Sequence, residues 1–62
     1  MEEKRKWDVY QIYDSYETPD FRFVGSTYAT NCEKAIANVR YRTKIKDSSD
    51  EHGQTYLQAY PA

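Results

Sequence analysis

Ten aromatic residues in a chain of 62 set the strongest limit on what this sequence can fold into. Seven of them are tyrosines, and the others are Trp7, Phe21 and Phe23. A domain of this size has one thin core, and a single helix covers only one face of a short sheet. The aromatic side chains therefore outnumber the buried positions of a monomer. We expect the surplus to lie on a second face, where a twin subunit, another protein or stacked bases would cover it.

The length and the charge balance exclude several classes of protein. The chain makes one domain over residues 1–62, with a charged start at residues 1–6 that we expect to be frayed. Nine basic residues stand against ten acidic ones, so the net charge of −1 lacks the basic excess of proteins that bind mainly to phosphates. No apolar run is long enough for a transmembrane helix or a secretory signal. Cys32 is the single cysteine, so no internal disulfide is possible, and we expect a cytoplasmic protein.

Three segments have the composition of strands. The range 7–13 is dense in aromatic and β-branched residues and has no purely polar face, which predicts a central strand. After a turn-rich stretch at 14–20, the range 21–28 predicts a second strand that completes a hairpin. Gly25 in that strand indicates a bulge or a close backbone approach. The range 55–60 alternates cleanly between apolar and polar residues and predicts a third strand.

A helix is predicted between the second and third strands. Thr30 and Glu33 fit a capping box, with Thr30 at the N-cap. A stripe at helical spacing follows, formed by Cys32, Ala35, Ile36, Val39 and Thr43. The helix should run from about residue 31 to between 42 and 45. In residues 39–46, every second residue is basic, a period of two that would also fit a strand. We favour the helix because the cap and the stripe continue into this range without a residue that would end the helix.

The predicted fold is α+β, with the element order β-β-α-β. If the last strand lies beside the first, the three-stranded antiparallel sheet has the order 2-1-3. The helix packs on one face through Ala35, Ile36 and Val39, which leaves the other face open. Residues 46–54 are polar and turn-rich, and should form the loop from the helix to the last strand.

No set of residues in the sequence specifies a reaction. His52, the only histidine, lies in a polar loop that offers neither fixed geometry nor exclusion of water to a general base. The spacing of the neighbouring Asp47, Asp50 and Glu51 does not match an EF-hand, so we interpret them as solvated loop charges. No glycine-rich phosphate loop is present. We therefore expect no enzyme activity, no cofactor, no metal and no small-molecule substrate.

Two groups of side chains are candidates for binding a partner. Tyr10, Tyr56 and Tyr60 could stack bases on the open sheet face or form a dimer seam there. A basic cluster at the helix end consists of Arg40, Arg42, Lys44 and Lys46, with Tyr41 inside it. This cluster could bind phosphates or an acidic protein surface, or could reflect the preference of a helix C-terminus for cations.

Part of the chain resembles a known family. Val24-Gly25-Ser26, Ala29 and the range 35–40, with the opening at 7–10, resemble the strand-to-helix passage of the small B subunit of phenylacetyl-CoA ring-oxygenase complexes. That family's subunit is non-catalytic and bridges larger subunits, so the resemblance implies a structural role. The loop at 46–54 departs from the family pattern, and no functional residue carries over. In size the chain also resembles the small orphan proteins of phages and mobile elements, which often bind one host protein.

These features together predict a non-catalytic interaction or accessory protein. It would bind a protein partner, or itself as a homodimer, through its tyrosine-bearing sheet face, its basic helix end, or both. The alternative is a small nucleic-acid-binding protein that uses Arg40, Arg42 and Lys44 together with exposed tyrosines. The slightly acidic net charge favours the protein partner.

Overall fold

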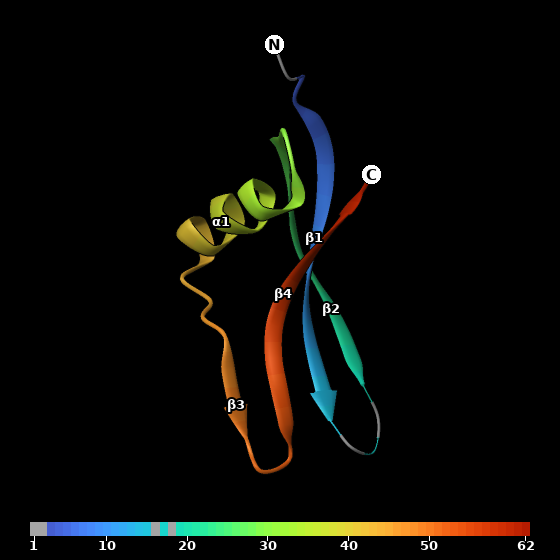
Figure 1. The fold of residues 1–62 in the computed structure, drawn as a ribbon, viewed down its shortest axis with the longest axis vertical. Coiled ribbons are helices and arrows are strands. Elements are labelled where there is room, and N and C mark those ends of the chain that lie inside the picture. Colours follow the sequence, from blue (N-terminus) through green and yellow to red (C-terminus); the bar gives the residue numbers. More distant parts are fainter. Residues whose placement is uncertain (1–2, 16, 18) are drawn as a thin grey trace.

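A four-stranded antiparallel sheet and one helix make up this small α+β fold (Figure 1). The computed structural model of the protein describes residues 3–15, 17 and 19–62. The elements in chain order are β1 (Arg5–Ser15), β2 (Asp20–Ala29), α1 (Cys32–Thr43), β3 (Ser48–Asp50) and β4 (Gly53–Pro61). The strand order in the sheet is β2-β1-β4-β3. The predicted turn at 14–20 includes residues 16 and 18, which lie outside the described residues.

The sheet has one strand more than the sequence predicts. β3 pairs with β4, so the predicted three-stranded sheet of order 2-1-3 is wrong. A tight turn joins these two strands, and the carboxylate of Asp50 accepts hydrogen bonds there from the backbone N–H groups of His52 (2.8 Å) and Gly53 (3.0 Å). All three residues of β3 are polar and exposed, so no hydrophobic pattern distinguishes them from the loop predicted at 46–54.

β1 is central among the long strands, as its two-sided apolar pattern predicts. It pairs antiparallel with β2 on one edge and with β4 on the other. The register between β1 and β2 shifts between Val9 and Tyr10, where Val24 is an extra residue beside Gly25. This β-bulge confirms the irregularity predicted at Gly25. No close backbone approach accompanies it, because a Cβ atom on Gly25 would meet no atom within 4 Å.

The N-terminus of α1 is capped by Asn31. Its side-chain oxygen accepts a hydrogen bond of 2.9 Å from the backbone N–H of Lys34, the third residue after it. The predicted capping box of Thr30 and Glu33 is therefore wrong by one position, because the neighbouring asparagine takes the cap. The Thr30 hydroxyl oxygen is instead buried without a hydrogen-bond partner among the described residues.

The C-terminus of α1 is set by Lys44. This residue adopts a left-handed conformation (φ 63°, ψ 17°), and its backbone N–H donates a hydrogen bond of 2.8 Å to the carbonyl oxygen of Arg40. The helix thus ends at Thr43, inside the predicted range. The alternative of a strand over residues 39–46 is excluded.

The hydrophobic core lies between α1 and one face of the sheet. Its buried members are Trp7, Val9, Ala29, Ala35, Val39, Leu57 and Ala59. The helix covers the half of the sheet that holds the start of β1, and the other half extends past the helix toward the hairpin ends (Figure 1). This arrangement gives an elongated molecule, 43 Å long and 20 by 16 Å across.

Candidate interaction surface

The sheet face opposite α1 carries a group of aromatic side chains. Trp7 and Val9 of β1 belong to the core beneath the helix, so the alternate residues Tyr10 and Ile12 lie on the other face. Paired residues of an antiparallel sheet share a face, which extends this assignment to β2 and β4. The aromatic residues on this side, which we call the aromatic face, are Tyr10, Phe21, Phe23, Tyr28, Tyr56 and Tyr60.

Three rings of the aromatic face form contacts that span three strands. Tyr10 lies at the centre, with its ring centroid 5.5 Å from that of Phe23 on β2 and 5.9 Å from that of Tyr60 on β4. The interplanar angles are 70° and 68°, the edge-to-face geometry that aromatic pairs prefer. Ile12, whose cross-strand neighbours are Phe21 and Tyr56, is only 4% exposed although no described helix covers this side. The rings therefore form a thin second hydrophobic layer.

Most of this layer is open to solvent. The exposed fractions are 62% for Phe21, 55% for Phe23, 63% for Tyr28 and 44% for Tyr60. Single exposed apolar residues are common on protein surfaces, but a contiguous group of large rings marks an interaction site. The described part of the chain provides nothing that covers these four rings.

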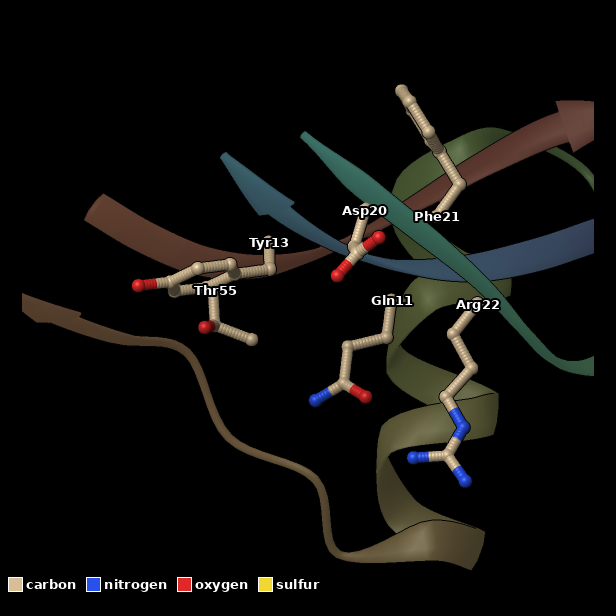
Figure 2. A pocket seen from close by; sticks show the side chains of 6 residues that line it. All are labelled: Gln11, Tyr13, Asp20, Phe21, Arg22 and Thr55. Carbon is tan, nitrogen blue, oxygen red and sulfur yellow. The ribbon is translucent and has the colours of Figure 1, made fainter. Parts of the chain in front are cut away.

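The bulge in β2 decides which of its side chains share the aromatic face. Before the bulge, Phe21 and Phe23 are paired with β1 residues of this face. After the bulge the alternation is shifted by one residue, and Ser26 and Tyr28 take these positions. Figure 2 shows the side chain of Phe21 on the opposite side of β2 from that of Arg22, which points toward the side of α1.

The structure places the predicted binding residues in two separate groups. Tyr10, Tyr56 and Tyr60 lie on the aromatic face, where the sequence predicts them. The basic cluster lies at the end of α1, on the other side of the sheet. Sequence reasoning missed Phe21, Phe23 and Tyr28 as members of the face. The spacing of the two phenylalanines was an available signal, whereas the place of Tyr28 depends on the bulge.

Three of the four cations of the basic cluster, Arg40, Arg42 and Lys44, have partners within the chain. Arg40 forms an ion pair with Asp47 at 2.7 Å, in which the two side chains are 39% and 56% exposed. Arg42 donates a hydrogen bond of 2.8 Å to the carbonyl oxygen of Ser26. The ammonium group of Lys44 lies 4.6 Å from the ring centroid of Tyr41, a cation–π contact. These contacts tie the end of α1 to the loop after it and to β2.

The charged residues on the aromatic side of β1 are of both signs. Lys6 and Asp14 are both exposed, and neither forms an ion pair with any residue that the structure describes. Asp8 lies between them and accepts a hydrogen bond of 2.9 Å from the hydroxyl of Ser26 on β2. The aromatic face thus has a cation near one end, a carboxylate near the other, and the hydrogen-bonded carboxylate of Asp8 between Lys6 and the ring of Tyr10.

A shallow hollow lies on the helix side of the sheet, beyond the end of α1 (Figure 2). Its volume is about 380 Å³, and its lining residues are Gln11, Tyr13, Asp20, Phe21, Arg22 and Thr55. The lining contains one cation (Arg22), one carboxylate (Asp20) and the hydroxyl groups of Tyr13 and Thr55.

The loop histidine and the acidic residues near it lie at the β3–β4 turn. His52 is 3.5 Å from the carboxylate of Glu51, and both side chains are strongly exposed. Within residues 3–15, 17 and 19–62, no group of three histidine, cysteine or acidic side chains is placed to hold a metal ion. In the same part of the chain, no helix has the length and apolar character needed to cross a membrane.

Comparisons with known proteins add no relative to this picture. No protein-family model, no curated protein and no solved structure matches the chain. The geometry of the aromatic face is therefore the main basis for a functional proposal.

Proposed function

We propose that this protein is a non-catalytic interaction or accessory protein that binds a protein partner through its aromatic face. The observation that carries the proposal is that four exposed rings, Phe21, Phe23, Tyr28 and Tyr60, lie on one side of the sheet. Tyrosine and phenylalanine bury a large area with few rotatable bonds, which is why aromatic residues are enriched in protein interfaces. The single cysteine is consistent with a cytoplasmic site of action.

The distribution of charge makes nucleic acid the less favoured partner. Proteins that stack bases on aromatic rings also place cations beside those rings to hold the phosphates. Arg40, Arg42 and Lys44 lie on the opposite side of the sheet and have contacts of their own. On the aromatic side, the charge of Lys6 is offset by Asp8 and Asp14. The proposed contact surface is therefore the aromatic face and not the basic end of α1.

The two resemblances of the sequence agree with this proposal and remain predictions. The small B subunits of ring-oxygenase complexes bridge larger subunits, and small phage or mobile-element proteins often bind one host protein. Both imply a role in binding without catalysis, and neither identifies the partner.

Affinity capture from lysate of the native host tests the proposal. The Phe23→Ser/Tyr60→Ser variant removes two exposed rings, and Tyr41→Ser is the matched control because Tyr41 is 77% exposed on α1, away from the aromatic face. We expect the wild type and the control to retain a common protein, and the double variant to retain about tenfold less of it. Equal capture by all three folded proteins would contradict the proposal. So would salt-sensitive binding of labelled oligonucleotides in place of a protein.

A further inference from the structure

We infer that the partner of the aromatic face is a second copy of this chain, packed face to face with the two β1 strands antiparallel. The inference rests on the proposed function of this face and names its occupant. Closed dimers of identical chains are usually two-fold symmetric, so every contact across the interface occurs twice. The arrangement of charges and rings along β1 and β4 selects one orientation of the two-fold axis.

Lys6 and Asp14 are placed symmetrically about Tyr10, whereas Asp8, which accepts the hydrogen bond from Ser26, has no charged counterpart at Ile12. Lys6 precedes Tyr10 by four residues and Asp14 follows it by four, so each is about 13 Å from it at a rise of about 3.3 Å per residue. A two-fold axis that passes Tyr10 and runs across the strands brings Lys6 of one copy opposite Asp14 of the other. Because both residues lack an ion pair among the described residues, this orientation gives two intermolecular ion pairs without breaking an existing one.

An axis along the strands would have the opposite effect. It would bring Lys6 near Lys6 of the second copy and Asp14 near its own counterpart, and like charges facing each other are destabilising. Packed sheets cross at about 30°, which offsets the ends of the two β1 strands from each other. The long side chain of Lys6 can span such an offset.

The same axis also matches the rings. Tyr60 pairs with Asp8, two residues before Tyr10, and Tyr56 pairs with Ile12, two residues after it. Tyr60 of one copy therefore lies opposite Tyr56 of the other. Phe23 pairs with Tyr10 itself and faces its own counterpart. Two sheets packed about 10 Å apart in this way would cover the rings of Phe23, Tyr56 and Tyr60 with other rings, whereas Phe21 of one copy would lie opposite Ser26 of the other.

Charge reversal tests both the dimer and its orientation. Sedimentation analysis over a range of protein concentrations would measure the dissociation constant of the wild type, of Lys6→Glu and of Asp14→Lys. We expect a reversible wild-type dimer, and a rise of about tenfold in the dissociation constant for each single variant, because both symmetry-related ion pairs become repulsive. The Lys6→Glu/Asp14→Lys double variant should dimerise like the wild type. An equimolar mixture of the two single variants should form heterodimers, in which both pairs are again attractive.

Charge reversals away from the aromatic face serve as controls for the two single variants. Lys34→Glu on α1 and Asp20→Lys on the helix side of β2 make the same changes of charge away from the aromatic face and should leave the dissociation constant unchanged. If a reversed variant fails to fold by circular dichroism, Lys6→Gln and Asp14→Asn replace it, with smaller effects in the same direction. A wild type that stays monomeric, or a dimer insensitive to both reversals, would overturn the inference. A monomer that still loses a captured protein with Phe23→Ser/Tyr60→Ser would leave the proposed function standing.

Discussion

The indole nitrogen of Trp7 donates a buried hydrogen bond of 3.0 Å to the carbonyl oxygen of Ala29. This bond joins β1 to the last residue of β2, where the chain leaves the sheet for α1. Trp7→Phe removes the donor and should lower the free energy of unfolding by about 1–3 kcal/mol. Urea unfolding followed by circular dichroism measures the change. Tyr41→Phe, at an exposed site, should change it by less than about 0.5 kcal/mol, and equal stabilities for the two variants would contradict the role of the bond.

The two glycines should respond oppositely to substitution by alanine. A Cβ on Gly53 would overlap the carbonyl oxygen of Asp14 and lie 2.8 Å from the Cα of Ser15, so Gly53→Ala should destabilise the fold by about 1–3 kcal/mol. A Cβ on Gly25 would meet open space, and its φ is not positive. Gly25→Ala should therefore stabilise the fold by about 0.4–1 kcal/mol, because alanine restricts the unfolded chain. Thermal unfolding of both variants checks the prediction, and a similar loss for both would refute it.

The residues at the start of α1 allow a test of which one caps the helix. Asn31→Ala removes the acceptor of the Lys34 N–H and should cost about 1 kcal/mol of stability. Thr30→Val removes a buried hydroxyl that has no partner among the described residues, and should leave the stability unchanged or raise it by up to about 1 kcal/mol. Chemical denaturation of the two variants gives both values. A larger loss for Thr30→Val than for Asn31→Ala would show that Thr30 is the cap.

The extent to which the sequence predicts the fold differs from element to element. β1 is recognisable as a central strand because both of its faces carry apolar residues, and α1 is recognisable from the stripe that includes Ala35 and Val39. β3 is not, because Ser48–Asp50 has no apolar residue and forms a strand only by pairing with β4. The cap moves from Thr30 to Asn31 because both side chains can accept the bond and local sequence does not decide between them.

The sequence predicts that an aromatic face exists, but it does not predict all the residues of that face or where the face lies relative to the basic cluster. A surplus of aromatic residues over core positions predicts a second aromatic face, and alternation along the strands assigns Tyr10, Tyr56 and Tyr60 to it. The separation of this face from the basic residues of α1 depends on which side of the sheet the helix covers. The internal partner of Arg42, the carbonyl oxygen of Ser26, depends on how α1 and β2 pack against each other. Such tertiary relationships are not encoded in residue spacing.

The extra residue at Val24 has a consequence for how this chain can vary. Val24 has no partner on β1, so a chain that lost this residue would keep every other pair in register, with Phe23 opposite Tyr10 and Gly25 opposite Val9. Tyr28 would then stay on the aromatic face, and Ala29 would stay in the core. Homologous chains that keep this fold can therefore absorb the loss of one residue from β2 by losing the bulge.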